Sequence, residues 1–146
     1  MKRVILIFFL GFSNSVAAPF DDYKDGMKAY KSGDVAAALE FFLAKVAEKP
    51  RHQKSVNMIK QLVPEVIELR TQKAMKFEES ENWGRAKKEY ERLERLNRVL
   101  QRLVVYDRGQ KLTFEHIDVG GAEENASNTA AEKYYALGVQ AMQTPG

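Results

Sequence analysis

The residues best able to do chemistry are few and scattered along this 146-residue chain. Its two histidines, His52 and His116, lie in unrelated contexts, and there is no cysteine. No His-x-x-x-His or comparable ligand spacing occurs, so we expect no metal site. No serine lies in a Gly-x-Ser-x-Gly turn, and Gly120-Gly121 lacks the strand–loop–helix setting of a phosphate site. Nothing combines a nucleophile, a base and an oxyanion donor, so we expect neither an enzyme nor a bound cofactor.

Basic residues between positions 83 and 105 form the strongest charge feature. Six of them lie in one helix-length run: Lys87, Lys88, Arg92, Arg95, Arg98 and Arg102. A basic helix suits an anionic partner such as nucleic acid, an acidic protein or lipid headgroups. The ordinary alternative is a solvated face balanced by Glu89, Glu91 and Glu94. Two pairs four residues apart in the favourable order, Glu91–Arg95 and Glu94–Arg98, support that alternative. We favour the balanced face and expect no nucleic-acid partner.

The elements that would position a binding surface are helices. Apolar residues recur at spacings of three and four through most of the chain before residue 105. Lys49-Pro50 ends one helix, because the residue before proline disfavours helical geometry. Pro64 marks either a break or the first turn of a new helix. The expected helices are 20–32, 35–48, 51–63, 64–80 and 83–105.

The segment Gly26–Pro50 predicts a helix–turn–helix unit. Gly33 can take the left-handed conformation that closes one helix, and Asp34 can cap the next. Small residues stand where two helices would cross closely: Gly26, Ala29 and Ala38. The apolar faces exceed what two helices can bury alone, so further helices must stack on this unit.

The order of residues in this unit resembles a tetratricopeptide repeat. The positions that carry the resemblance are Gly26, Ala29, Tyr30, Gly33, Asp34, Ala38, Leu39, Phe42 and Pro50. The resemblance implies an all-α fold of helix–turn–helix repeats, stacked as a short α-solenoid that binds other proteins. It also implies a concave surface lined by the first helix of each unit. The candidate partner-binding residues there are Tyr23, Met27, Tyr30, Lys31, Met75 and Glu78. The alternative is that these aromatics and methionines belong to the core.

A second copy of the pattern follows 48 residues later. Ala74, Phe77, Asn82, Ala86 and Tyr90 occupy the positions of Gly26, Ala29, Asp34, Ala38 and Phe42, and Glu81 replaces Gly33. The offset exceeds the usual period of about 34 residues, and the helix expected at 51–63 accounts for the excess. We therefore assign residues 19–106 to tetratricopeptide-like repeats.

The remaining chain breaks the pattern and then resumes it. We interpret residues 107–128 as a loop or linker with one extended stretch at Lys111–Val119. Thr129 and Glu132 have capping-box spacing and open a last helix, so that 129–146 is the first helix of a further, incomplete repeat. This helix either caps the solenoid or begins a unit that continues past residue 146, and its outer side lacks the polarity of a cap.

Residues 1–18 have the parts of a secretory signal. A basic start, Lys2-Arg3, precedes the apolar run Val4–Phe12 and a small-residue exit at Ser15–Ala18. The run is shorter than the roughly 20 residues that span a bilayer, so we expect no transmembrane segment after cleavage. No cysteine marks a lipoprotein junction, and the chain lacks disulfides, which favours a bacterial periplasmic or secreted protein. Without this segment, 21 basic and 20 acidic residues remain, a nearly neutral chain.

The sequence thus predicts an exported tetratricopeptide-like scaffold for protein–protein interaction, in a bacterial periplasmic or envelope complex. One alternative is an assembly element that oligomerises through the apolar face of the 83–105 helix. Another is an envelope-surface binder that uses the basic face of the same helix.

Overall fold

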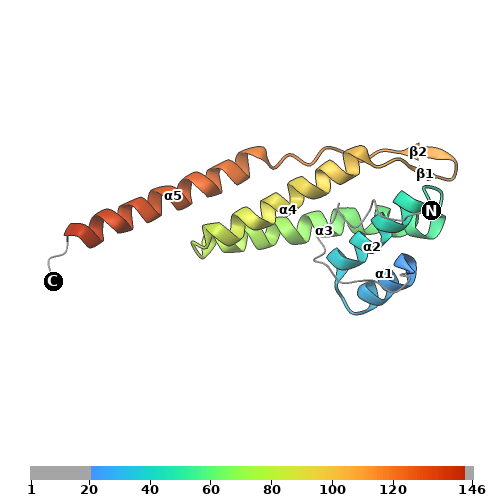
Figure 1. The fold of residues 1–146 in the computed structure, drawn as a ribbon, viewed down its shortest axis with the longest axis horizontal. Helices are drawn as coiled ribbons and strands as arrows, with labels where there is room; N and C mark the ends of the chain where they lie inside the picture. Colours follow the sequence, from blue (N-terminus) through green and yellow to red (C-terminus); the bar gives the residue numbers. More distant parts are fainter. Residues whose placement is uncertain (1–20, 144–146) are drawn as a thin grey trace. The chain divides into compact units, whose positions relative to one another are not determined.

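The structure is a computed structural model that describes residues 21–143, so the predicted signal segment lies outside the described residues. The fold is all-α, as predicted, with one small β-hairpin. Its elements are α1 (Asp22–Lys31), α2 (Val35–Glu48), α3 (Gln53–Glu79), α4 (Trp83–Arg102), β1 (Val105–Asp107), β2 (Gln110–Leu112) and α5 (Gly120–Gln143) (Figure 1). The chain divides into two compact units. Among the described residues, 21–67 and 99–115 form the first, and 68–98 and 116–143 form the second.

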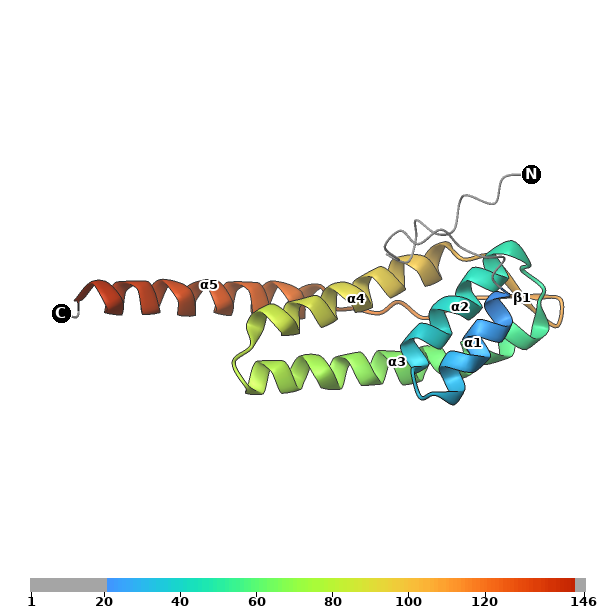
Figure 2. The ribbon, with the colours of Figure 1, turned by 60° about the horizontal axis from the view of Figure 1, so that its bottom comes forward.

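The first unit is built around one apolar side of α2. Figure 2 shows α1 and α2 lying against the first half of α3. The buried apolar residues of this unit are Ala38, Leu39, Phe42, Leu43, Val46, Val56, Ile59, Leu62, Val63, Val66, Leu100 and Val105. Their three- and four-residue spacing places each set on one side of its helix. Burial of these side chains, rather than helix propensity, holds the short helix α1 in place.

The turn between α1 and α2 forms as Gly33 and Asp34 predict. Gly33 has a φ of +84°, and its N–H donates to the Tyr30 carbonyl at 3.0 Å. The N–H of Asp34 donates to the Ala29 carbonyl, also at 3.0 Å. The Asp34 carboxylate accepts a hydrogen bond from the N–H of Ala37 at 3.0 Å and caps α2. The turn is a Schellman motif followed by a capped helix.

The β-hairpin extends the first unit and is tied to the start of α3. Arg108 and Gly109 have φ values of +50° and +87°, which two-residue hairpin loops of type I′ require. Gln53 donates from Nε2 to Asp107 Oδ1 at 2.8 Å and accepts from the Arg108 N–H at 3.0 Å. The Lys60 ammonium also pairs with Asp107. These hydrogen bonds hold the pKa of the Asp107 carboxyl below its usual range.

The second unit contains a second helical hairpin, between the end of α3 and α4. Glu81 has a φ of +57°, and its N–H donates to the Glu78 carbonyl at 2.9 Å. The N–H of Asn82 donates to the Phe77 carbonyl at 2.7 Å. These are the hydrogen bonds of the first turn, repeated 48 residues later. A glutamate replaces glycine here, and the left-handed conformation costs a non-glycine residue about 1 kcal/mol.

Helix α5 belongs to the second unit and packs through its first half. Val119 and Ala126 are buried, and Lys133 pairs with Glu81 and lies over the Trp83 ring, 5.6 Å from its centroid. The C-terminal part of α5 continues past the α3–α4 turn (Figure 1). Tyr135 of this helix is 76% exposed. The side chains of Tyr134, Leu137 and Ala141 in this helix lie outside the described residues.

The predicted helix boundaries at Pro64 and at residue 105 are wrong. Pro64 neither ends nor begins a helix, because α3 runs through it as one helix. The proline is exposed, so water can reach the carbonyl that it leaves unbonded, while Val63 and Val66 fix the helix in the core. The 83–105 helix ends at Arg102, since Val105 turns into the hairpin.

The interpretation of 107–128 as a loop is also wrong beyond residue 119. Helix α5 begins at Gly120, where the Asp118 carboxylate accepts the Gly120 N–H at 3.3 Å. Thr129 and Glu132 therefore lie inside the helix rather than at its start. The extended stretch lies at Gln110–Leu112, at the edge of the predicted range.

Candidate partner-binding faces

The outward side of α1 brings together three of the six predicted binding residues. Tyr23, Met27 and Lys31 are spaced by four residues and so lie on one side of the helix. They line a surface depression together with Lys24 and Lys28. We call these five residues the α1 face. The two additional lysines escaped the sequence analysis, although Lys24 lies three residues before Met27 and Lys28 three before Lys31, the spacing of neighbours on a helix surface.

Tyr23 also serves the core, which was the alternative interpretation of the aromatics. Its ring centroid lies 5.7 Å from that of Phe42 and 5.3 Å from that of His52, in tilted and edge-on geometries. Such aromatic pairs contribute about 0.5–1.5 kcal/mol beyond the area they bury. Tyr23 is thus a fixed wall of the α1 face, and Met27 is its adaptable apolar part.

The charges on the α1 face are positive and mostly unpaired. Lys24 is 3.8 Å from the Asp21 carboxylate, but its side chain is 82% exposed, so this pair is weak. Lys28 and Lys31 are exposed and form no ion pair with any residue between 21 and 143. An apolar strip bordered by free ammonium groups can bind a ligand that carries both an apolar group and a carboxylate.

Tyr30 does not belong to this face. Its hydroxyl accepts a hydrogen bond from Nε2 of Gln61 at 3.0 Å, which ties α1 to α3 inside the first unit. The predicted residue therefore has a structural partner already.

Met75 and Glu78 belong to the second unit. Met75 is 51% exposed, whereas Glu78 accepts a hydrogen bond from the Tyr90 hydroxyl at 3.2 Å. Burial raises the pKa of Tyr90, and the Glu78 carboxylate raises it further. The hydroxyl thus stays protonated as a donor, and Glu78 has a structural role in the α3–α4 hairpin.

Neither histidine lies in a ligand cluster. Nδ1 of His52 accepts from the Ser55 hydroxyl at 2.7 Å and from the Ser55 N–H at 3.3 Å, so the ring caps α3. Burial, together with Lys45, Lys49 and Lys54, lowers the pKa of His52. Nδ1 of His116 is 3.1 Å from Nδ2 of Asn97. No group of three side chains able to hold a metal occurs within the described part of the chain.

Each glutamate of α4 pairs with a basic residue of the same helix, but one predicted pair does not form. Glu91 pairs with Lys87 at 3.9 Å rather than with Arg95. Glu89 is buried, 5% exposed, and pairs with Arg92 and with Arg70 of α3. The predicted pair of Glu94 and Arg98 does form, at 3.1 Å.

Comparisons with protein-family models, with curated proteins and with solved structures return no match for this chain. Among the helices of residues 21–143, none is long and apolar enough to cross a membrane.

Proposed function

We propose that this protein is an exported, tetratricopeptide-like interaction module that binds a partner protein through the α1 face. The observation that carries the proposal is the α1 face itself, where Met27 lies beside Lys28 and Lys31, which form no ion pair with any residue between 21 and 143. Tyr23, whose ring packs against Phe42, fixes one side of this surface, so the site is largely formed before a partner binds.

The repeated turn geometry supports the repeat part of the proposal. Both hairpins close with the same two backbone hydrogen bonds, at Gly33-Asp34 and at Glu81-Asn82. Both place a small residue, Gly26 or Ala74, in the buried part of the first helix. Such helix pairs serve in solenoids as binding surfaces rather than as catalytic centres.

The chemistry of the face suggests the kind of segment that it would bind. Met27 and the Tyr23 ring offer apolar contact, and the lysines offer charge to an acidic side chain. An amphipathic helix or an extended peptide with alternating apolar and acidic residues presents both groups at this spacing. The proposed partner is therefore a protein segment of mixed apolar and acidic character.

The oligomerisation alternative has less support. The apolar side of α4 is buried within the chain at Ala86, Tyr90, Leu93 and Leu100. A second copy could reach these side chains only if α4 left its present neighbours. A light-scattering mass that rises with protein concentration would revive this alternative.

The proposal is tested by photo-crosslinking in cells. A crosslinking residue at position 27 should give one discrete adduct with an envelope protein, and one at Glu65, exposed on α3, should not. Lys31→Glu should weaken the adduct at position 27, because it reverses a charge on the face.

Lys54→Glu, an exposed charge reversal on α3, is the matched control and should leave that adduct unchanged. Equal adducts at positions 27 and 65, or equal loss with both charge reversals, would contradict the proposal.

A further inference from the structure

One side of the α3–α4 hairpin carries a row of exposed cations. Arg85, Lys88, Arg92 and Arg95 follow each other at spacings of three, four and three residues, which places them on one side of α4. All four side chains belong to exposed residues. The row is about 15 Å long at the rise of an α-helix.

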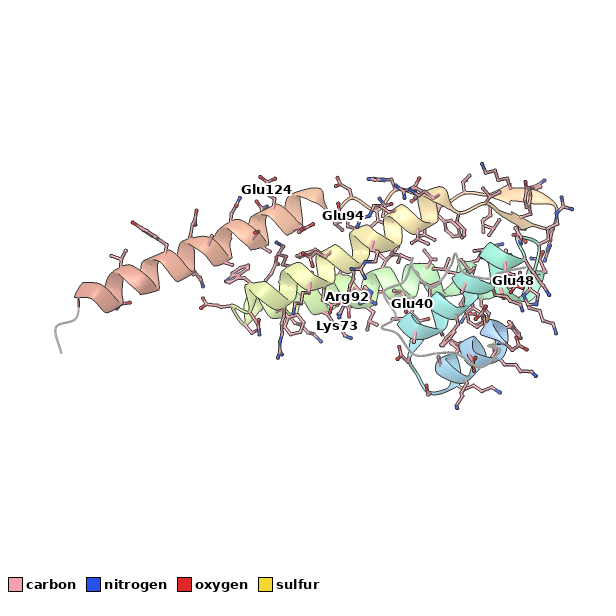
Figure 3. The ribbon with its side chains drawn as sticks, viewed as in Figure 1. Glu40, Glu48, Lys73, Arg92, Glu94 and Glu124 are labelled. Atoms are coloured by element: carbon pink, nitrogen blue, oxygen red, sulfur yellow. The ribbon has the colours of Figure 1, made fainter. Side chains whose placement is uncertain are left out.

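Helix α3 adds a fifth cation, Lys73, beside this row. Arg70 reaches Glu89 at 3.0 Å, and the Arg85 guanidinium lies 5.8 Å from the centre of the Phe77 ring. The side of α3 that carries positions 70 and 77 therefore meets this side of α4. Lys73 lies between those positions in the helical register and is exposed (Figure 3). We call Lys73, Arg85, Lys88, Arg92 and Arg95 the basic face.

The acidic residues of α4 leave the basic face largely unneutralised. Figure 3 labels Arg92 and Glu94 on different sides of α4, and Glu94 pairs with Arg98 there. Glu91 lies three residues after Lys88 and four before Arg95, yet it pairs with Lys87, at 3.9 Å. These two carboxylates thus pair with Lys87 and Arg98, which lie outside the basic face.

Glu89 neutralises only part of the remaining charge. Its single buried carboxylate is shared by two guanidinium groups, those of Arg70 and Arg92. Lys88 and Arg95 form no ion pair with any residue in the described range 21–143. The face keeps a net positive charge although the chain as a whole is nearly neutral.

We propose that the basic face docks on an anionic lipid surface through the headgroup phosphates. The large exposed apolar residues of the described chain are Met75, Val104 and Tyr135, and none belongs to this face. Recognition here therefore rests on charge carried by long, extended side chains, which suits a flat array of phosphates better than a folded partner. This inference is independent of the partner proposed for the α1 face.

Vesicle binding by two matched double variants of the full chain tests the inference. Lys88→Gln/Arg95→Gln removes two unpaired charges, and Lys87→Gln/Arg98→Gln removes two paired ones from the same helix. Both variants lower the net charge by the same amount and keep the same N-terminal segment. Any membrane affinity of that segment is therefore the same in both variants and cancels when they are compared. Binding to vesicles of phosphatidylglycerol and phosphatidylcholine would be measured by co-sedimentation at 50 and 300 mM salt, with circular dichroism as the folding control.

We expect the first variant to lose roughly 25-fold in affinity at low salt, about fivefold for each charge. The second should lose less than about fivefold, and high salt should weaken the unmodified chain steeply. Equal losses in the two variants, or no preference for anionic over neutral vesicles, would overturn the inference. Tighter binding to a DNA duplex than to vesicles at equal phosphate concentration would also overturn it, because the face would then recognise polyanions in general.

Discussion

A β-carbon added to Gly26 would lie 2.8 Å from Cε1 of Phe42 and 3.0 Å from its Cζ. Phe42 is fully buried, so its ring cannot move out of the way without opening the core. The contact between α1 and α2 therefore depends on the missing side chain at position 26. The second hairpin has an alanine, Ala74, at the corresponding position, where it is buried.

Replacing Gly26 with alanine should destabilise the protein. Alanine gains about 1 kcal/mol over glycine in a helix, but overpacking a rigid core costs about 1–3 kcal/mol. We expect the free energy of unfolding to fall by up to about 2 kcal/mol in urea denaturation. Gly84→Ala is the matched control, because Gly84 is helical and has open space around it, and that change should be neutral or stabilising. A stabilised Gly26→Ala variant would show that Phe42 yields.

Substitutions at Gly33 and Glu81, the two helix-ending residues with positive φ, should change the free energy of unfolding in opposite directions. Gly33→Ala should lower the free energy of unfolding by about 1–2 kcal/mol, since a β-carbon disfavours its positive φ. Glu81→Gly should raise it by about 0.5–1 kcal/mol for the same reason. The second change is best measured in a Lys133→Gln background, because Glu81 pairs with Lys133. If both substitutions stabilised the protein, or both destabilised it, the two turns would not share one geometry.

The helical hairpin at residues 22–48 could be predicted from the sequence because its signals are local. Gly33 and Asp34 act through their own backbone and the next turn of helix, and α2 has the predicted bounds. The α1 face was predicted only in part. Lys24 and Lys28 lie on it because of helical spacing alone, whereas Tyr30 leaves it because of Gln61, which is 31 residues away.

The missed features depend on residues that are distant in sequence. The β-hairpin is anchored by Gln53, more than 50 residues away from its loop. Helix α3 continues through Pro64 because core packing on both sides outweighs the lost hydrogen bond. The exposed cations of α4 are only partly neutralised, because the buried carboxylate of Glu89 is shared between Arg92 and Arg70 of α3. Single-residue signals and helical periodicity do not contain these tertiary contacts.

The cap at His52 predicts a pH-dependent stability. Because Nδ1 accepts two hydrogen bonds from Ser55, the capping ring is neutral. Folding lowers the pKa of His52, so the unfolded chain binds this proton more tightly than the folded one. The stability that the neutral His52 ring contributes is therefore complete above its unfolded pKa of about 6.5. This stability is lost as the pH falls from about 6.5 through the lower pKa of the folded state.

His52→Asn should remove this dependence. Asparagine is a strong N-cap that does not titrate, so the variant should keep most of its stability at pH 8. Urea denaturation at pH 8 and pH 5 should show a decline of free energy in the unmodified chain that is clearly smaller in the variant. The charged groups around the ring, Lys45, Lys49, Lys54 and Asp21, remain in both proteins. An unchanged decline in the variant would assign it to other groups.

Replacing Asn97 should lower the hydrogen-exchange protection of the segment that leads to α5. The side chain is 6% exposed, accepts the Ile117 N–H at 2.9 Å and lies 3.1 Å from Nδ1 of His116. Asn97→Ala should leave that N–H unpaired and cost about 1–2 kcal/mol. Hydrogen exchange at the Ile117 amide should then be faster by at least tenfold, which corresponds to about 1.4 kcal/mol of local opening.

Two further variants separate the partners of Asn97. His116→Ala removes only the contact with Nδ2 and should leave the Ile117 amide protected, because the acceptor Oδ1 remains. Asn97→Asp keeps an acceptor for the same N–H and should also preserve much of the protection. If His116→Ala exposes the amide as strongly as Asn97→Ala does, the imidazole rather than the carboxamide oxygen holds this segment, and the hydrogen bond to Ile117 contributes little.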